Sequence, residues 1–202
     1  DPDDTSIQIG SGPDNPIGYR WIGFYGNYGI HGTNHPESIG GYVSNGCVRM
    51  KEADVEDLYQ YVSVGTPVTV YYDRLVIDVD PDHTVSYYIY PDGYGWQSLS
   101  IAQVKKALAG YGVEDFADFQ EISDKINASD GNVTYIAKAY DLVVNGHKLA
   151  KRALGKNGQI YLPSVAVATA LNLDLQWNSQ QGILTSPYGI APGYVKSDVV
   201  YM

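Results

Sequence analysis

Cysteine is nearly absent from this chain of 202 residues, which has a single one, Cys47. One thiol cannot form an internal disulfide, so it is either a small buried group or a reactive one. Methionine, phenylalanine and tryptophan are also scarce, with two, three and three residues, whereas there are 19 tyrosines. Tyrosine covers apolar surface while its hydroxyl stays in water, which is typical of β-rich domains with polar surfaces.

Positive charge and long apolar runs are also lacking. Thirteen Lys and Arg face 23 Asp and Glu, which gives a net charge of −10. That charge repels a phosphate backbone, so we expect no nucleic acid as a partner. No apolar run approaches the length of about 18 residues that a membrane span needs, so we predict none in this chain. The hydrophobic residues, 44% of the total, suffice for the core of one large or two small domains.

The first 95 residues are dominated by patterns typical of strands. A helix over about 52–63 is predicted by the spacing of Val55, Leu58 and Val62, and the acids at its start favour a helix amino terminus. Before it, residues 21–30 are predicted to form a strand that leads into His31. After it, β-branched and aromatic runs predict further strands. Those strands are 68–72, 75–79 and 84–90.

The remaining residues divide into a helical part and a second β-rich part. Helical spacing over 101–108 and 116–126 predicts a connector of two helices. The Asn145-Gly146 pair is a strong signal for a two-residue hairpin turn. The row of charges at Asp78, Asp80, Asp82 and His83 lacks the glycine and terminal glutamate of a calcium loop, so we interpret it as a solvated turn. The domains predicted are 1–95, a helical connector 96–131, and 132–202.

Chemistry is concentrated around Cys47. A thiol becomes a good nucleophile when a histidine or a helix amino terminus favours its thiolate, and Cys47 lies before the predicted helix with His31 sixteen positions upstream. The backbone N–H groups of Asn45, Gly46 and Cys47 could converge on one oxyanion. Arg49 is suited to binding a carboxylate, or alternatively to pairing with the acids that begin the helix, Glu52 or Asp54. This set indicates acyl transfer from an amide whose donor carries an acid.

At these residues the chain resembles the catalytic domain of the L,D-transpeptidases, the YkuD-like family that remodels peptidoglycan. The resemblance covers roughly residues 13–72 and lies in several short motifs in family order. They are Asn15-Pro16-Ile17-Gly18, His31-Gly32-Thr33, Ser38-Ile39-Gly40, Ser44, Gly46-Cys47-Val48-Arg49-Met50 and Gly65-Thr66-Pro67-Val68.

The resemblance implies a fold and a set of roles. The fold is a mainly β catalytic domain, a β-sandwich with a helix after the catalytic cysteine. The roles are a nucleophile at Cys47, a base at His31, and a Gly32 carbonyl that orients the imidazole. Substrate contacts are implied for Arg49, Ser44 and Thr33. His35 is instead interpreted as an exposed loop residue.

Two departures from the family pattern stand out. Asn45 occupies the position before Gly46 where most members have histidine, so a second imidazole is lacking. Because the base is the upstream histidine, this change is expected to alter hydrogen bonding around the thiol more than to abolish chemistry. The amino-terminal half of the family domain has no counterpart here. The resemblance is therefore to its carboxy-terminal part, and we expect upstream sequence.

Residues 135–186 resemble the copper amine oxidase N-terminal-like domain, a small α+β accessory module of secreted bacterial proteins. The residues that carry this resemblance are Val144-Asn145-Gly146, Tyr161-Leu162-Pro163, Val165 to Ala170, Leu171-Asn172-Leu173 and Gln176-Trp177. The segment has a single histidine, His147, and no cluster of ligands. We therefore predict no metal there, and no cofactor for the chain.

The resemblances favour a secreted or wall-associated bacterial enzyme that acts on peptidoglycan stem peptides. The predicted activity is cysteine-dependent acyl transfer that forms 3→3 cross-links in cell-wall biogenesis, with a role in cell shape and sensitivity to carbapenems. Two alternatives remain open at this point. One is an L,D-carboxypeptidase or endopeptidase that uses the same site with water as acceptor. The other is a wall-binding module in which the thiol is inactive or weak.

Overall fold

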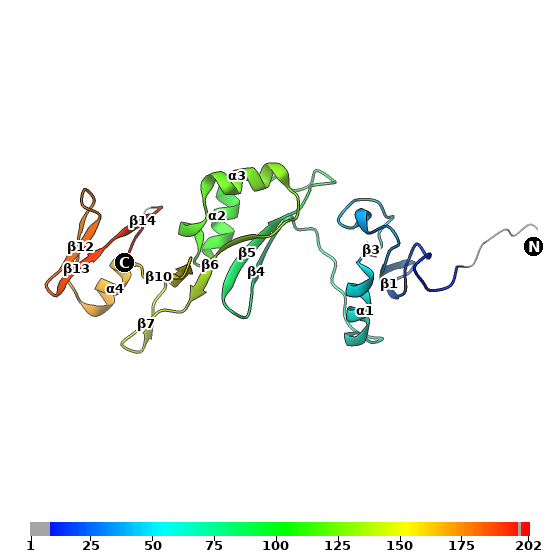
Figure 1. Cartoon of the computed structure of the whole chain (residues 1–202), viewed down its shortest axis with the longest axis horizontal. Coiled ribbons are helices and arrows are strands. Elements are labelled where there is room, and N and C mark those ends of the chain that lie inside the picture. The colour runs from blue at the N-terminus through cyan, green and yellow to red at the C-terminus, as the bar shows by residue number, and fades with distance from the viewer. Residues whose placement is uncertain (1–8, 198) are drawn as a thin grey trace, which may run out of the picture. The chain divides into compact units, whose positions relative to one another are not determined.

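The computed structural model describes residues 9–197 and 199–202, and the chain divides into two compact units after Tyr72 (Figure 1). The segments 1–8 and 198 lie outside the described residues, so the predicted domain 1–95 is described from residue 9. Strands contribute more residues than helices in the described part, as the tyrosine-rich composition predicted.

The first unit is built around a sheet of three short strands in the order β1-β2-β3. Strands β1 (Trp21–Tyr25) and β2 (Tyr28–His31) form an antiparallel hairpin, and β3 (Val48–Arg49) pairs in parallel with β2. The sequence predicted one strand over 21–30, whereas Gly26, with φ of +51°, turns the chain back on itself. Within 9–72 the structure has this single sheet, so the β-sandwich is not seen there.

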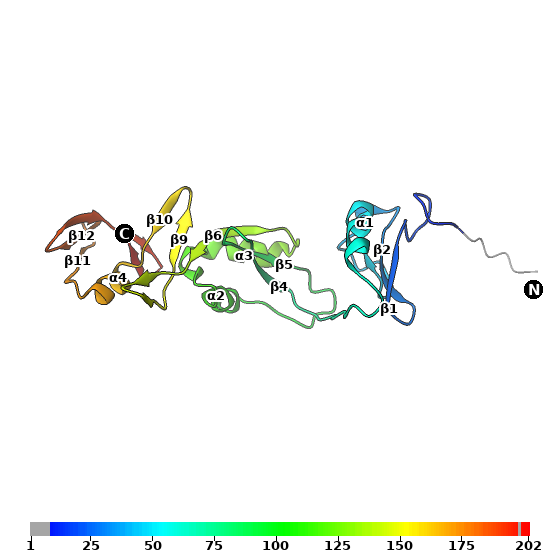
Figure 2. The same cartoon turned by 90° about the horizontal axis from the view of Figure 1, so that it is seen from below.

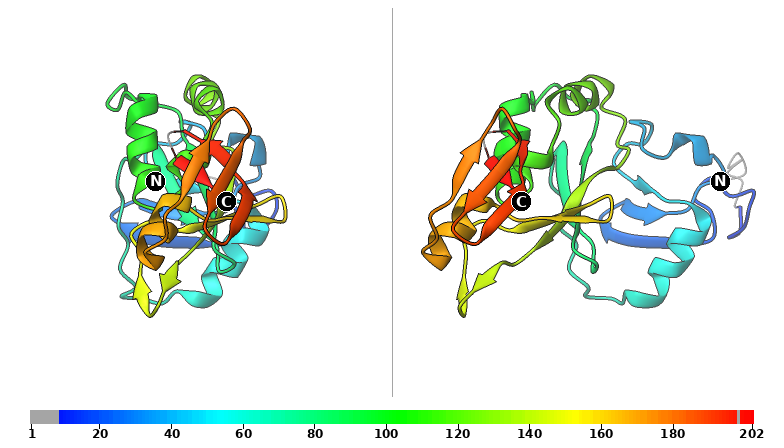
Figure 3. Two further views of the ribbon diagram at one scale, coloured as in Figure 1. Left: turned by 90° about the vertical axis from the view of Figure 1, so that its left-hand side faces the viewer. Right: turned by 60° about the vertical axis from the view of Figure 1, so that its left-hand side comes forward.

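Helix α1 (Glu52–Tyr61) follows the sheet, close to the predicted range (Figure 3). Val55 is its one fully buried residue. The apolar sheet face that carries Ile22, Phe24 and Ile30 lines a cleft of about 610 Å³ together with the carboxy-terminal end of α1. The predicted strand over 68–72 does not form, because this segment pairs with no strand of the described chain.

The second unit contains an antiparallel sheet of five strands in the order β10-β9-β6-β5-β4. Two helices, α2 and α3, pack on it, joined by a 3-10 helix at Glu114–Phe116 (Figure 2). The elements are β4 (Leu75–Val79), β5 (Thr84–Ile89), α2 (Ile101–Ala109), α3 (Phe119–Ala128), β6 (Thr134–Tyr140), β9 (Ala153–Lys156) and β10 (Gln159–Tyr161).

The core of the second unit lies between this sheet and the two helices. Alternate residues of β5, Val85 and Tyr87, face Leu108 of α2 and Ile122 of α3, and each of these side chains is at most 1% exposed. Burying such side chains stabilises the folded state by roughly 1.5–3 kcal/mol each. The predicted helical connector is therefore an integral layer of this unit.

The carboxy-terminal segment adds small sheets around one helix. Val143–Val144 (β7) and His147–Lys148 (β8) form the hairpin predicted at Asn145-Gly146, and both turn residues have the positive φ that this turn requires. The remaining elements are α4 (Ser164–Leu171), β11 (Gln176–Asn178), β12 (Ile183–Ser186), β13 (Gly189–Pro192), β14 (Tyr194–Lys196) and β15 (Val199–Tyr201).

The boundary between the compact units differs from the domain limits predicted from sequence. The sequence suggested a break near residue 95, whereas β4 pairs with β5, β5 pairs with β6, and all three strands belong to the second unit. In the sheet β6 lies next to β5, although α2 and α3 separate the two strands in the sequence. This long-range pairing explains the difference.

The acidic row around Asp82 is a structural turn between β4 and β5. Asp82 pairs with Lys138 of β6 at 2.8 Å and accepts a hydrogen bond from the Thr84 N–H. The hydrogen bond from the Lys138 ammonium holds the pKa of this carboxyl well below its usual range. The Asp82 carboxylate thus stabilises the turn, in agreement with the interpretation of this acidic row as a turn.

Buried tyrosines make the stability of the second unit sensitive to alkaline pH. Burial raises the pKa of Tyr87 to about 12, and burial with the hydrogen bond to Asp115 raises that of Tyr201. A tyrosine in the unfolded chain ionises near about pH 10, so above that pH the unfolded state loses a proton that the folded state keeps. The free energy of unfolding is therefore expected to fall as the pH rises from about 10 to about 12.

Between about pH 10 and about pH 12, the free energy of unfolding of the Tyr87→Phe variant should fall less than that of the wild-type chain. The difference should reach up to about 2–3 kcal/mol. Urea unfolding at a series of pH values measures this difference. Tyr188→Phe is the matched control, because Tyr188 is 84% exposed. An equal alkaline loss in Tyr87→Phe and Tyr188→Phe would contradict the assignment.

Candidate functional site

The parallel pairing of β2 with β3 brings the predicted site residues to one face of the sheet. His31 lies opposite Arg49 in the register, and Cys47 immediately precedes β3. Because side chains alternate along a strand, Cys47 and Arg49 fall on the same face as His31. Trp21 lies opposite His31 on the other side and belongs to this face too. We call it the His31 face.

The imidazole of His31 is held in one orientation. Its side chain is buried, with 4% of the residue exposed, and its ring stacks on the indole of Trp21 at a centroid distance of 5.6 Å. The Nδ1 atom is hydrogen-bonded to the backbone carbonyl of Gly32. A carbonyl can only accept, so Nδ1 carries the proton and Nε2 of the neutral ring is left as the basic nitrogen.

The Cys47 thiol is half-buried and points towards the β1–β2 turn. Its Sγ donates a long hydrogen bond of 3.7 Å to the carbonyl of Asn27. In the described structure the thiol and the His31 imidazole are not hydrogen-bonded to each other. Catalytic hydrogen bonds are often long or absent without substrate, so proton transfer between the two stays a prediction.

The loop before Cys47 is shaped by Ser44 and Gly46. The Ser44 hydroxyl donates to the Cys47 carbonyl at 2.6 Å and accepts from the Gly46 N–H at 3.3 Å. Gly46 has φ of +126°, and a Cβ added there would lie 2.4 Å from the ring of Tyr28. Glycine is therefore required by both backbone and space. The Gly46 N–H, predicted to bind an oxyanion, is engaged with Ser44 in this structure, and the Asn45 side chain is exposed.

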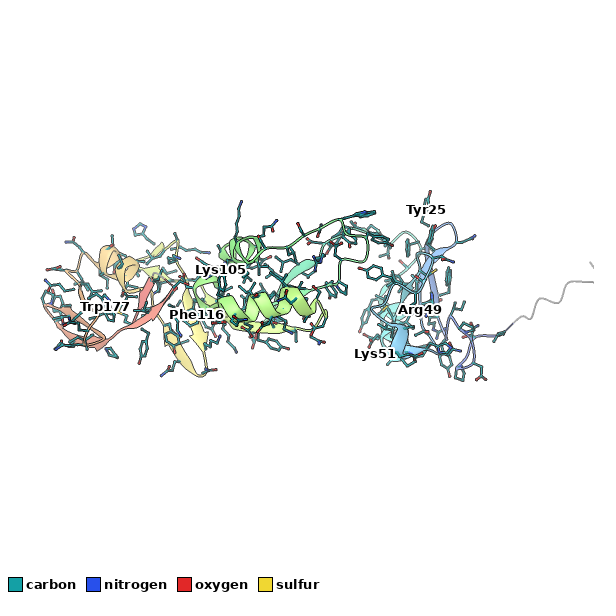
Figure 4. All side chains as sticks on the ribbon, turned by 90° about the horizontal axis from the view of Figure 1, so that it is seen from above. Tyr25, Arg49, Lys51, Lys105, Phe116 and Trp177 are labelled. Atoms are coloured by element: carbon teal, nitrogen blue, oxygen red, sulfur yellow. The ribbon has the colours of Figure 1, made fainter. Side chains whose placement is uncertain are left out.

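Arg49 does not pair with the acids that begin α1, so that alternative is wrong. One guanidinium nitrogen donates to the Ser38 hydroxyl at 2.8 Å and another to the Val43 carbonyl at 3.3 Å. Its Nε is buried and has no partner among the residues that the structure describes. Both hydrogen-bond partners are neutral, and Glu37 interacts with the guanidinium charge without forming an ion pair with it in the described structure. Figure 4 shows Arg49 on the first unit.

In the loop after His31, Thr33 is buried and His35 is exposed. Thr33 is 4% exposed, and its hydroxyl accepts a hydrogen bond from the His35 N–H at 3.1 Å. Thr33 therefore holds the loop, and its contact with substrate stays a prediction. His35 is exposed as expected, and its ring lies 3.0 Å from Glu37.

Glu52 is the residue of this region whose position the sequence did not reveal. Its carboxylate is packed against two glycines, because a Cβ added to Gly18 or Gly32 would lie 1.9 or 2.2 Å from Oε1. Its Oε2 accepts the N–H of Tyr19 at 3.1 Å, whereas Oε1 is buried without a partner in the described structure. The signal in the sequence was the two glycines, each just before or within a family motif.

The Glu52 carboxylate joins three segments that meet behind His31. It lies at the start of α1, accepts from the Tyr19 N–H, and is packed against Gly32, whose carbonyl orients the imidazole. The Gly32 N–H also donates to the Arg20 carbonyl at 3.4 Å. A negative charge in the first turn of a helix is favourable. Glu52 therefore supports the part of the backbone on which the His31 orientation depends.

The described residues contain neither a metal-binding cluster nor a membrane-spanning helix. No group of three or more His, Cys, Asp and Glu side chains there is placed to hold a metal ion. Among the helices in the same part of the chain, none has the length and apolar character to cross a membrane.

Comparison with known proteins identifies the first unit. Residues 2–70 match the family of the L,D-transpeptidase catalytic domain, which confirms the resemblance for this segment. A putative L,D-transpeptidase, YqjB of Bacillus subtilis, is 52% identical over 67 residues, which cover 30% of this chain and 38% of that protein. The putative L,D-transpeptidase YkuD of the same species is 49% identical over 59 residues, 29% of this chain and 36% of the relative.

A more distant relative gives the same indication. The probable L,D-transpeptidase ErfK/SrfK of Salmonella typhimurium is 38% identical over 88 residues, which cover 44% of this chain and 25% of the relative. The chain thus spans less than two fifths of the length of these curated relatives. The family match lies within the first unit, whereas the alignment with ErfK/SrfK covers more residues than that unit contains.

Replacing Glu52 is expected to loosen the backbone behind His31. In Glu52→Ala, the Tyr19 amide loses its acceptor, and hydrogen exchange measured by NMR should show that amide exchanging at least about tenfold faster. The variant should also lose about 1–3 kcal/mol of unfolding free energy. Glu52→Gln keeps an acceptor oxygen of the same shape and should leave the Tyr19 exchange close to that of the wild type. Unchanged exchange of the Tyr19 amide in Glu52→Ala would show that the Glu52 carboxylate does not hold this backbone segment.

Proposed function

We propose that the first unit carries the active site of a peptidoglycan L,D-transpeptidase that forms 3→3 cross-links through an acyl-enzyme on Cys47. The observation that carries this proposal is the His31 ring, whose Nδ1 is tied to the Gly32 carbonyl so that Nε2 is free to act as a base. Cys47 and Arg49 lie on the same face of the sheet. The names of the relatives support the reaction class.

In the first half-reaction the stem peptide of the donor is attacked at the carbonyl of its third residue. His31 Nε2 takes the thiol proton, and the Cys47 sulfur forms a bond to the carbonyl carbon. Backbone N–H groups of the 45–47 loop would bind the oxyanion, which requires the Gly46 N–H to leave Ser44. The C–N bond then breaks, and the imidazolium returns its proton to the amine of the departing D-amino acid.

In the second half-reaction the thioester is transferred to an acceptor. The side-chain amine of a second stem peptide attacks the thioester carbon, His31 takes the proton from that amine, and the thiol is released with a proton from the imidazolium. The product is an amide between the third residues of two stems. If water takes the place of the amine, the same residues perform the carboxypeptidase or endopeptidase reaction. No step requires a cofactor.

Arg49 provides the charge that places the donor. Its guanidinium is anchored by Ser38 and Val43 yet has no carboxylate partner in the described structure. A half-buried positive charge without an ion pair in the described structure favours a carboxylate of the substrate, because a charge-assisted hydrogen bond is stronger than a neutral one. Ser44 and Thr33 are proposed to shape the same binding surface.

The remaining parts of the proposal concern the second part of the chain and the location. We assign residues 132–202 to a copper amine oxidase N-terminal-like accessory domain and 96–131 to a helical connector, although both share one compact unit with β4 and β5. The Asn145-Gly146 hairpin, helix α4 and the Trp177 strand occur in the expected order. Because mature wall peptides lie outside the cytoplasmic membrane, the protein is proposed to act there, secreted or attached to the wall.

Acylation by a carbapenem tests the proposed site directly. Attack of Cys47 on the lactam carbonyl opens the ring, moves a proton to its nitrogen and adds the whole drug mass to the chain. Intact-mass analysis should show one adduct on the wild type and none on Cys47→Ala. Alkylation of the unfolded chain controls for a free thiol. A reactive thiol in the unfolded chain with no adduct in the folded one would refute an active site in this chain.

The base is tested by a matched pair of histidine variants. His31→Gln should slow acylation by about 10²–10⁴-fold at neutral pH, because the thiol loses its proton acceptor. His35→Gln removes an exposed imidazole from the same loop and should change the rate less than about twofold. Equal rates in the two variants would contradict the assignment of His31.

The role of Arg49 is tested by changing the donor as well as the enzyme. Arg49→Gln should lower kcat/KM for a tetrapeptide donor with a free terminal carboxylate by about 10–100-fold. The variant should have little effect on a donor whose terminal carboxylate is amidated, because the wild type already lacks that ion pair. Arg20→Gln, which removes a surface pair with Glu56, is the control. Equal losses on both donors would make Arg49 a structural residue only.

A further inference from the structure

The second unit contains a cavity that the proposed reaction does not use. It has a volume of about 470 Å³ and lies where α2, the 3-10 helix, the β9–β10 turn and β14 meet. None of its lining residues belongs to the first unit, so its role is independent of Cys47. The residues that the inference uses are Lys105, Lys156, Lys196, Phe116, Phe119 and Tyr161.

Three amines are gathered at this cavity. Lys105 comes from α2, Lys156 from the end of β9, and Lys196 from β14. None of them has a carboxylate within 4 Å among the described residues, whereas four of the six other lysines form ion pairs. Lys105 donates instead to the Ser197 hydroxyl at 3.4 Å, so a chain of net charge −10 has three amines without an ion pair at one cavity. Their mutual repulsion is relieved when an anion binds between them.

The carboxylates that line the cavity are largely committed to other partners. Asp115 accepts from the Tyr201 hydroxyl at 2.9 Å and lies 3.4 Å from the Lys151 ammonium. Asp118 accepts from the Glu121 N–H at 2.9 Å as the cap of α3, and the residue is exposed to solvent. The positive charge of the cavity therefore exceeds its free negative charge.

Aromatic rings form the second feature of the cavity. Two of the three phenylalanines of the chain, Phe116 and Phe119, line it together with Tyr161. Phe116 is 7% exposed and is fixed by edge contacts with Tyr161 and Tyr201 at 5.0 and 5.3 Å. The Lys196 ammonium lies 5.6 Å from the Phe116 ring centroid, and Figure 4 shows Lys105 and Phe116 in the same region. Phe116 and Tyr161 are thus held by their ring contacts, whereas Phe119 is 64% exposed and offers its ring to a ligand.

We propose that this cavity binds a sugar ring that carries an acidic group. Aromatic faces pack against the apolar C–H face of a sugar, and ammonium groups bind carboxylate or phosphate as point charges. The Asn157 amide and the Ser197 hydroxyl, which also line the cavity, supply hydrogen bonds for sugar hydroxyls. The acid can be a carboxylate, as in a muramic acid, or a phosphate ester, as in a phosphorylated sugar, because lysine binds both.

Titration of the full chain followed by NMR tests this site. The probes are N-acetylmuramic acid, N-acetylglucosamine 6-phosphate and neutral N-acetylglucosamine. We expect the backbone signals of residues around Phe116 and Lys196 to shift with one or both acidic probes, with Kd in the range of about 0.1–5 mM. The affinity should fall as salt is raised, because the amines supply the binding energy through charge. The probe that binds better identifies the source of the acid.

Variants separate the site from general charge effects. The triple variant Lys105→Gln, Lys156→Gln and Lys196→Gln should raise Kd at least about tenfold, whereas Lys106→Gln, outside the cavity, should change it less than about twofold. Phe119→Ala provides a second test, because Phe119 is 64% exposed and its loss leaves the core intact. It should also weaken binding.

Three results would overturn the proposal. They are the absence of shifts at the cavity with both acidic probes, equal affinity for the neutral sugar, and unchanged Kd in the triple variant. Loss of Cys47 acylation would leave this result unaffected, so the two proposals fail separately.

Discussion

The first unit depends on the parallel pairing of β2 with β3. This pairing sets His31 opposite Arg49 and puts Cys47 on the same face, and the Met50 N–H donates to the His31 carbonyl at 2.8 Å to extend it. Parallel strands cannot be joined by a tight turn. The chain between them is therefore a long loop, and that loop carries Ser38 and Ser44, which hold the guanidinium and shape the backbone next to the thiol.

The buried carboxylate of Glu52 is the second constraint on the same region. Taking a carboxylate out of water is costly, so it is retained only where hydrogen bonds and close packing offset the desolvation. Gly18 and Gly32 leave the space for it, and the Tyr19 N–H supplies a bond. The same carboxylate ties the start of α1 to the backbone beside His31. The position of the helix and the backbone that orients the His31 imidazole are thus coupled through one side chain.

The two units differ in how they are stabilised and in what their surfaces offer. The second has an extensive apolar core of Val85, Tyr87, Leu108 and Ile122, whereas Val55 is the one buried apolar side chain in the described part of the first. Eight of the nine lysines also belong to the second unit. A chain whose composition argues against anionic partners can still bind a small anion, because net charge is a property of the whole molecule and a site depends on local charge.

Local features of this protein follow from its sequence. The helix 52–61 and the Asn145-Gly146 hairpin are set by residue spacing and turn chemistry, which act within a few positions. The set of Cys47, His31 and Arg49 was predicted from residue type and the family motifs, and their meeting at one sheet required the pairing of β2 with β3. Other features depend on contacts in three dimensions. A bulge between Gly23 and Tyr25 sets Trp21 against His31, and pairing of β5 with β6 across two helices moves the unit boundary to Tyr72. The position of Glu52 and the meeting of three lysines were likewise decided by contacts between segments far apart in the chain, which no local pattern encodes.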